Sequence, residues 1–295
     1  MSIREGKILA LAGGNDFANK PIDELQSLFT EVLNKGVHGL CFSAYEEGQK
    51  PGDLLSEEQI RRRMKIIQPY TKWIRSFSCI EGNELIPKIA KEFGIKTLVG
   101  AWLGKEPEKN EQELSALIDL AKQGFVDIAA VGNEVLYRKE LTEDELLAHI
   151  ERVKLAIPHI PVGYVDAYYE FSARPKITAA CDVILANCYP FWEFCHIDYS
   201  LMYMKQMYYQ AKQAGGSKPV IITETGWPSQ GEDHHGALPS KESALRYFLS
   251  TQQWSQKDDI NIFYFTSFDE SWKVGTEGDV GAYWGIWDKD ENLKY

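Results

Sequence analysis

The stretch KTLVGAWLGKEPEKNEQELSALIDLAKQGFVDIAAVGNE, residues 96–134, contains the structural unit from which the fold is predicted. It begins with a run of β-branched and apolar residues, Lys96 to Trp102, and ends with a second such run, Val126 to Glu134. Between them, Asn110 to Gln123 carries apolar residues at helical spacing. Two short runs joined by an amphipathic helix are typical of a β-α-β unit with parallel strands.

The same alternation continues along the rest of the chain. The strand candidates are Gly39 to Tyr45, Trp73 to Ser78, Lys96 to Trp102, Val126 to Glu134, Pro161 to Tyr169, Asp182 to Tyr189, Pro219 to Gly226 and Ile260 to Phe268. The helical patterns are Glu57 to Ile67, Asn83 to Phe93, Asn110 to Gln123, Thr142 to Ile157, Tyr199 to Ala214 and Lys241 to Gln253. Eight such units without a Pro/Gly-rich linker predict an α/β fold, a single (β/α)8 TIM barrel.

A ninth strand-like run, Lys7 to Ala12, precedes these units and is followed by a helical pattern from about Pro21 to Lys35. We interpret residues 1–35 as an N-terminal extension that covers the base of the barrel, and residues 36–295 as the barrel itself. Residues 1–295 then form one catalytic domain. In the alternative, the barrel starts at the ninth run and one later candidate is not a barrel strand.

Composition limits the class of partner. The chain has 295 residues, 44% of them hydrophobic, and a formal net charge of −11. The acidic balance and the lack of a long basic run argue against binding to nucleic acid or to an acidic lipid surface. Since no apolar run approaches the roughly 18 residues of a membrane helix, we expect no membrane span. A small or neutral partner is therefore expected.

Cysteine usage and the N-terminus bear on localisation. The five cysteines show no C-x-x-C spacing and are predicted to be mostly free, buried thiols, although a disulfide between two of Cys181, Cys188 and Cys195 stays open. The segment Met1 to Glu5 does not resemble the start of a signal peptide. The protein is either secreted or periplasmic, with its signal peptide removed, or cytoplasmic. An extracellular substrate would favour the first.

Two strand candidates carry a glutamate at or near their carboxyl end. Val131 to Glu134 (VGNE) closes the fourth, and Thr223 to Gly226 (TETG), which contains Glu224, closes the seventh. The carboxyl ends of barrel strands share one rim, so both glutamates are expected in one cleft. The apolar residues before each glutamate indicate buried strands, where an ionised carboxylate is costly without a task or a partner. Two facing carboxylates are the requirement of glycoside hydrolysis, and a retaining mechanism needs them about 5–5.5 Å apart.

These motifs resemble glycoside hydrolase family 17, the β-1,3-glucanase family. The resemblance spans about Gly39 to Tyr295. It is carried by VGNEV at 131–135, ETGWPS at 224–229, NCYPF at 187–191, FTSFDESWK at 265–273 and YWGIWD at 283–288. The two glutamate motifs in this order are specific to the family, whereas each motif alone is only suggestive.

The resemblance implies the chemistry. Glu134 would be the general acid/base and Glu224 the nucleophile of a retaining hydrolase that cleaves β-1,3-glucans such as laminarin, with no cofactor and no metal. The protein is expected to be a monomer. One alternative is a β-1,3-glucanosyltransferase that uses the same covalent intermediate. Another is a catalytically silent glucan-binding barrel, against which the presence of both glutamates argues.

Further residues are predicted to bind substrate. Asn133 is placed to hydrogen-bond the sugar 2-hydroxyl, or else is a structural amide, and Asn187 belongs to the sixth-strand turn. Glu270 and Lys273 bind sugar hydroxyls, hold the nucleophile ionised, or form a structural ion pair. The aromatic residues expected to stack on sugar rings are Tyr189, Trp192 and Trp227.

The chain departs from the family pattern around its first two strands. Family members often carry a tyrosine after the arginine of the second strand, where this chain reads Arg75-Ser76-Phe77. If that hydroxyl contacts the nucleophile, its absence changes the acidity of Glu224. The segment 43–52, SAYEEGQKPG, looks closer to the bacterial branch of the family than to the plant one.

Overall fold

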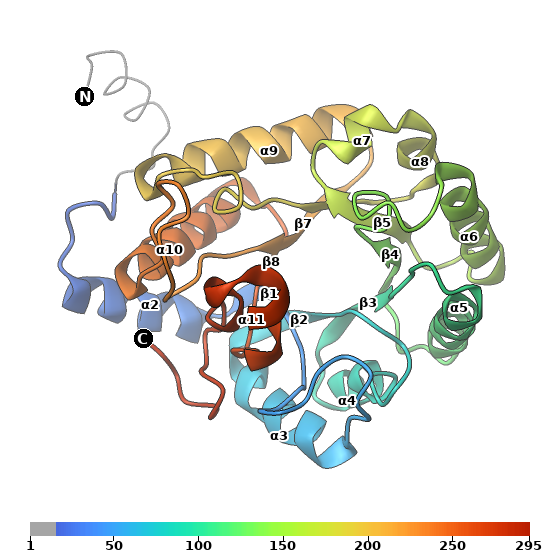
Figure 1. Cartoon of the computed structure of the whole chain (residues 1–295), viewed down its shortest axis with the longest axis horizontal. Coiled ribbons are helices and arrows are strands. Elements are labelled where there is room, and N and C mark those ends of the chain that lie inside the picture. Colours follow the sequence, from blue (N-terminus) through green and yellow to red (C-terminus); the bar gives the residue numbers. More distant parts are fainter. Residues whose placement is uncertain (1–15) are drawn as a thin grey trace.

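The computed structural model describes residues 16–295, in which eight parallel strands close into a barrel in chain order (Figure 1). The strands are β1 (Val37–Cys41), β2 (Thr71–Ser76), β3 (Lys96–Ala101), β4 (Ile128–Asn133), β5 (Val162–Ala167), β6 (Ile184–Asn187), β7 (Val220–Thr225) and β8 (Ile262–Tyr264). Closure is made by β8 pairing with β1, where Gly39 lies opposite Phe263 and Leu40 opposite Tyr264. The predicted TIM barrel is confirmed, and each of the eight strand candidates overlaps one of these strands.

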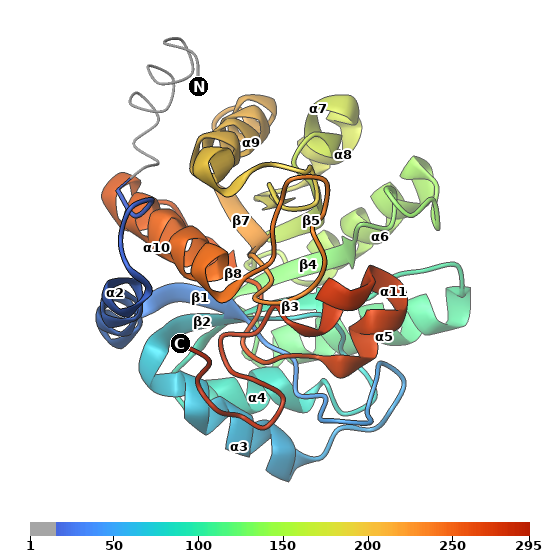
Figure 2. The same ribbon diagram turned by 60° about the vertical axis from the view of Figure 1, so that its left-hand side comes forward.

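Helices surround the barrel (Figures 1 and 2). They are α2 (Ile22–Lys35), α3 (Glu57–Ile67), α4 (Leu85–Glu92), α5 (Pro107–Lys122), α6 (Glu143–Ala156), α7 (Glu170–Ala173), α8 (Pro175–Ala180), α9 (Ser200–Gly215) and α10 (Lys241–Asp258). Side chains fix where several of them begin. Ser56 with Gln59, and Thr142 with Glu145, form capping boxes at the starts of α3 and α6. The short helices α7 and α8 were not predicted.

The connection after β8 differs from the others. Instead of an outer helix, the chain forms the turns η3 (Ser271–Lys273), α11 (Val274–Glu277) and η4 (Asp279–Ala282), which lie in front of the barrel in Figure 1. The vacant place in the helix ring is taken by α2, which packs against α10. Phe29 of α2 contacts Phe248 of α10 and Tyr295, with ring centroids 4.8 and 5.0 Å apart. This helix therefore belongs to the wall of the barrel, while the strand-like run Lys7 to Ala12 lies outside the described residues.

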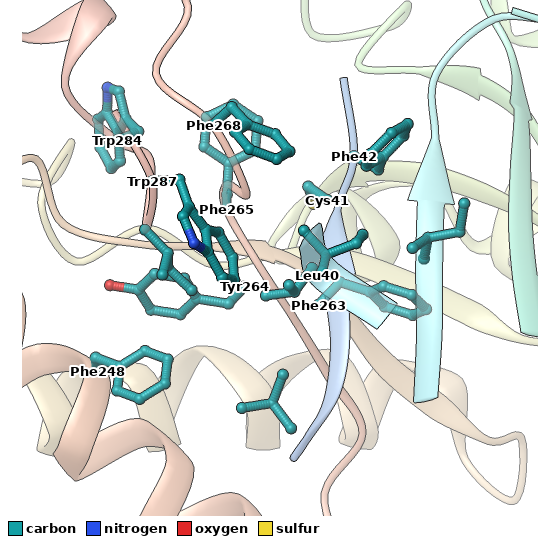
Figure 3. Packing of buried hydrophobic residues seen from close by; sticks show 14 of the residues in the cluster. Leu40, Cys41, Phe42, Phe248, Phe263, Tyr264, Phe265, Phe268, Trp284 and Trp287 are labelled. Atoms are coloured by element: carbon teal, nitrogen blue, oxygen red, sulfur yellow. The ribbon is translucent and has the colours of Figure 1, made fainter. Parts of the chain in front are cut away.

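Aromatic packing joins β8 and β1 to the C-terminal segment (Figure 3). Phe268 lies 5.7 Å from Trp287 between ring centroids, and Lys294 Nζ donates to Asp269 Oδ1 at 2.9 Å. Gly39 is required at the barrel seam, because a Cβ there would come within 2.5 Å of the Phe263 ring. These contacts fix the loop that follows β8, which borders the cleft described below.

Two further expectations can be compared with the described residues. All five cysteines are free and four of them are buried, as predicted. Within residues 16–295, no helix combines the length and apolar character that crossing a membrane requires.

The position of α2 predicts its contribution to stability. Phe29 is fully buried, so Phe29→Ala should lower the free energy of unfolding by about 3–5 kcal/mol, as expected for loss of a buried aromatic ring. The measurement is urea denaturation followed by tryptophan fluorescence. Asn34→Ala on the exposed face of the same helix is the control and should change the free energy by less than about 0.5 kcal/mol. Equal effects of the two substitutions would contradict the packing of α2 in the barrel wall.

Candidate active site

A cleft of about 1180 Å³ opens at the carboxyl ends of the barrel strands. Both Glu134, which follows β4, and Glu224, in β7, line it. The expectation that barrel topology brings the two side chains into one cleft is met. The contacts around each carboxyl group decide what this pair can do.

The backbone at the end of β4 turns sharply to present Glu134. The pairing with β5 shifts register between Ala130 and Asn133, and Gly132 adopts a φ of +84°. Glu134 itself has a φ of +51°, a left-handed conformation that is uncommon outside glycine. Its N–H donates to Val165 O at 2.8 Å, which anchors the turn to β5.

Glu224 is buried and accepts hydrogen bonds from three side chains. Arg75 Nη1 donates to Oε1 at 2.5 Å, Asn187 Nδ2 donates to the same oxygen at 3.2 Å, and Tyr189 OH donates to Oε2 at 2.9 Å. Charge-assisted bonds of this kind are stronger than neutral ones. They fix the orientation of the carboxyl group and offset the cost of burying it.

Asn187 connects the two carboxyl groups. Its Nδ2 lies 2.8 Å from Glu134 Oε1 and 3.2 Å from Glu224 Oε1, so these oxygens are at most 6.0 Å apart, the two bonds (2.8 plus 3.2) laid end to end. The amide orientation is set because Asn187 Oδ1 accepts a bond from Thr223 Oγ1 at 2.9 Å. One pair of oxygens this close fits the short separation of the two carboxyl groups, roughly 5–5.5 Å, of a retaining arrangement.

The environment of Glu134 favours its protonated form. Burial raises the pKa of this carboxyl group to about 7, and the nearby Glu224 charge acts in the same direction. The hydrogen bond from Asn187 partly opposes the rise. A carboxyl group that holds its proton near neutral pH can act as a general acid.

The remaining predicted residues divide into two groups. Asn133, Trp192, Glu270 and Lys273 all line the cleft, as do Asn187 and Tyr189. Asn133 Oδ1 accepts a bond from Arg75 Nη2 at 2.7 Å. Lys273 Nζ pairs with Glu270 Oε2 at 3.0 Å and lies 4.0 Å from the centroid of the Phe265 ring. Both side chains of this pair are largely buried.

Trp227 is not available for stacking, and the prediction that placed it in a subsite is corrected here. The residue is 1% exposed and does not line the cleft. Its indole Nε1 donates to Leu238 O at 3.0 Å, and its ring packs 5.2 Å from Phe191 and 5.4 Å from Tyr247. The side chain is therefore used in packing the loop that follows β7.

Arg75 was not predicted as a site residue. It is buried at the end of β2 and bonds both Glu224 and Asn133. An arginine among the apolar residues Trp73, Ile74 and Phe77 was the available signal, since a buried guanidinium requires an acidic partner. Phe77, which follows the second strand, lies 4.3 Å from the Arg75 guanidinium. The tyrosine hydroxyl that contacts Glu224 in this chain comes from Tyr189 instead.

We searched the described part of the chain for clusters of side chains that could bind a metal ion. Residues 16–295 contain no group of three or more His, Cys, Asp or Glu side chains arranged to hold a metal ion.

Known proteins resemble this chain in sequence. A family model described as the BtgE/BtgC glycoside hydrolase domain matches residues 39–285. The glucan 1,3-beta-glucosidase of Arthroderma benhamiae is 30% identical over 266 residues, which cover 83% of this chain and 85% of that protein. The glucan 1,3-beta-glucosidase BGL2 of Candida albicans is 28% identical over 262 residues, which cover 79% of this chain and 83% of that protein.

Solved structures resemble it in fold. The glycoside hydrolase family 17 beta-1,3-glucanosyltransferase from Rhizomucor miehei has a TM-score of 0.79 and 28% identity, covering 88% of this chain and 96% of that chain. An active-site mutant of that enzyme has been solved in complex with laminaritriose. An endo-laminarinase from Formosa Hel1_33_131 has a TM-score of 0.75 at 18% identity, a likeness of fold alone. Both sequence relatives above are fungal, so the bacterial-branch assignment is not confirmed.

The burial of Glu134 predicts how stability responds to pH. The native state keeps this proton up to about pH 7, whereas the unfolded chain releases it near the ordinary pKa of 4.5. Between these values the unfolded state binds fewer protons, so this group lowers the free energy of unfolding as pH rises. Glu134→Gln removes that loss. The free energy of unfolding of this variant, taken relative to that of the unsubstituted protein, should therefore be about 1–3 kcal/mol higher at pH 8 than at pH 5.

Urea denaturation at the two pH values measures this difference. Glu151→Gln, an exposed substitution on α6, is the matched control and should have the same effect at both. A Glu134→Gln variant whose effect does not depend on pH would contradict the burial of a protonated carboxyl group.

Proposed function

Because the chain belongs to glycoside hydrolase family 17, through its BtgE/BtgC glycoside hydrolase domain, we propose that it cleaves β-1,3-glucosidic linkages with retention of configuration. The observation that supports this proposal most directly is that the Asn187 amide donates hydrogen bonds to both carboxyl groups and so limits the separation of the two bonded oxygens. The substrate is a neutral β-glucan such as laminarin or its oligosaccharides. The relatives named for action on 1,3-β-glucan support that choice.

The first half of the reaction forms a glycosyl-enzyme ester. Glu224 attacks the anomeric carbon, and Glu134 donates its proton to the glycosidic oxygen as the bond to the leaving sugar breaks. Arg75, Asn187 and Tyr189 hold the Glu224 carboxyl group so that one oxygen can face the sugar. Because its pKa is raised, Glu134 still carries the proton to be donated at neutral pH.

The second half returns the enzyme to its starting state. Esterification of Glu224 removes the negative charge that helps to raise the pKa of Glu134. That pKa then falls, so Glu134 can act as a base that deprotonates the attacking water. Water attacks the anomeric carbon, the ester bond breaks, and the Glu224 carboxylate is released.

Four side chains are proposed to orient the substrate. Arg75 occupies Asn133 Oδ1, which leaves the Asn133 Nδ2 group to donate to the sugar 2-hydroxyl, a contact that strengthens towards the transition state. Trp192 at the cleft wall offers an aromatic face to the apolar side of a sugar ring. We assign the Glu270 and Lys273 pair, which also lines the cleft, to sugar hydroxyls.

A glucanosyltransferase activity is the second candidate. It uses the same ester but transfers the glycosyl group to another sugar in place of water. The 28% identity and TM-score of 0.79 to the Rhizomucor miehei enzyme are the observation that favours it. A silent glucan-binding barrel is not favoured, since both carboxyl groups lie within hydrogen-bonding distance of one amide nitrogen.

We also propose that residues 1–295 act as one catalytic domain. The packing of α2 against α10 supports this for the described part of residues 1–35. The bacterial-branch character of 43–52 stays a prediction.

The assigned roles predict different consequences for the two glutamates. Glu224→Ala should abolish hydrolysis of laminarin while leaving oligosaccharide binding detectable by calorimetry. Glu134→Ala should slow cleavage by about 10²–10⁴-fold, because the general acid is lost. Added azide should restore turnover of an activated aryl glycoside in Glu134→Ala and give the β-glycosyl azide. Recovery of the α-glycosyl azide, or full activity of Glu224→Ala, would contradict the assignment.

Product analysis distinguishes the two candidate reactions. With purified laminaripentaose at low concentration, hydrolysis predicts products shorter than the starting sugar. Transfer predicts longer products, whose share rises with substrate concentration because a sugar competes with water for the ester. Mass spectrometry in ¹⁸O-labelled water measures both routes at once. Longer products without label as the main outcome would identify a transferase.

A further inference from the structure

A further carboxyl group, Asp166, lies buried beside the turn that carries Glu134. It belongs to β5, is 0% exposed and does not line the cleft, so substrate cannot reach it. The neighbouring strand β4 pairs with β5 through Asn133 and Val165. Asp166 is therefore one residue away from the strand position opposite Asn133. The proposed reaction gives this acid no role.

The hydrogen bonds of Asp166 lead to the backbone that follows Glu134. Tyr164 OH donates to Asp166 Oδ2, and the same hydroxyl accepts a bond from the Leu136 N–H at 2.9 Å. The Tyr137 N–H also donates to the Asp166 carboxylate. Two successive N–H groups of the turn thus bond to this aspartate, one of them through Tyr164. The Ala167 N–H completes its partners at 2.8 Å.

This turn requires external support. Glu134 has a φ of +51°, and such conformations cost energy in residues with a side chain and persist only where surrounding contacts hold them. The Arg138 N–H donates to Glu134 O at 2.8 Å, which closes the turn on its far side. Loss of the Asp166 carboxylate would remove the acceptor of the Tyr137 N–H and of the Tyr164 hydroxyl that supports the Leu136 N–H, and so allow the turn to relax.

We propose that Asp166 is a positioning residue of the reaction: through Tyr164 and the Tyr137 N–H it holds residues 134–137 and so fixes the Glu134 carboxyl group opposite Glu224. The inference rests on the proposed acid/base role of Glu134. The charge of Asp166 also lies close enough to Glu134 to influence the pH at which Glu134 releases its proton.

The electrostatic contribution has a definite sign. Glu134 faces Glu224 from β7, Asn187 from β6, Arg138 from its own turn and Asp166 from β5. Burial and Glu224 raise the pKa of Glu134 most, and the Asp166 charge raises it further.

The charge state of Asp166 follows from its own surroundings. It faces Tyr164 on β5, Glu170 on α7, and Arg174, which lies between α7 and α8. Burial raises the pKa of Asp166 to about 6, so the group is mostly ionised at pH 7. Its replacement by a neutral amide must move the pKa of Glu134 downwards.

The test uses Asp166→Asn and a series of aryl β-laminaribiosides with leaving groups of increasing pKa. Misplacement of the general acid should lower kcat/KM at least about tenfold for poor leaving groups and hardly at all for 2,4-dinitrophenolate, which needs no proton. The basic limb of the pH profile of kcat/KM should move to lower pH. Tyr164→Phe should show the same dependence on leaving group, with its basic limb unmoved, because the Asp166 charge remains.

Glu170→Gln is the matched control. It removes a carboxylate near Asp166 that bonds Arg174 rather than the turn, and should leave the dependence on leaving group unchanged. Equal losses for all leaving groups in Asp166→Asn with an unmoved basic limb would overturn the inference and indicate a structural role. If Asp166→Asn does not fold, an unchanged dependence on leaving group in Tyr164→Phe overturns it instead. Failure of azide to rescue Glu134→Ala would reject the acid/base role itself, independently of Asp166.

Discussion

The shared Asn187 amide is the contact on which the chemistry of the site depends. Two carboxyl groups this close cannot both be ionised without cost, and the protein resolves the conflict asymmetrically. Glu224 receives hydrogen bonds from a guanidinium and a phenol in addition to the amide, whereas Glu134 receives one from the amide and has its pKa raised by burial and by the Glu224 charge. Glu224 therefore accepts three hydrogen bonds and Glu134 keeps the proton, which is the division of roles that a two-step displacement requires.

The barrel positions these groups because each comes from a different strand. Arg75, Asn187 and Glu224 belong to β2, β6 and β7, and Glu134 follows β4. No local segment could place them together. Closure of β8 on β1 and the buried pair of Lys294 and Asp269 give that arrangement a rigid frame. The only backbone of unusual conformation among these four positions is at Glu134, and there the contacts of β5 are concentrated.

Much of this was accessible from the sequence. The alternation of apolar runs and helical patterns predicted all eight strands, and the two strand-terminal glutamates were identified because both interrupt apolar context. Features that depend on tertiary packing could not be predicted from the sequence. Gly226 approaches Phe265 so closely that a Cβ would lie 2.1 Å from its carbonyl oxygen, and Trp227 beside it is buried in the adjoining loop. No spacing rule distinguishes that tryptophan from one in a cleft, or identifies Arg75 as the partner of a residue 149 positions away.

The exchange of the eighth outer helix for α2 has a consequence for biosynthesis. The apolar stripe of α2, which includes Leu25, Phe29 and Leu33, leaves the ribosome before its partner α10, which is made more than 200 residues later. Contacts of such long sequence separation form slowly, because a long loop must close first. During translation that stripe stays uncovered, and exposed apolar surface of this kind is what chaperones recognise. Completion of the cylinder is thus deferred until α10 and β8 have been made.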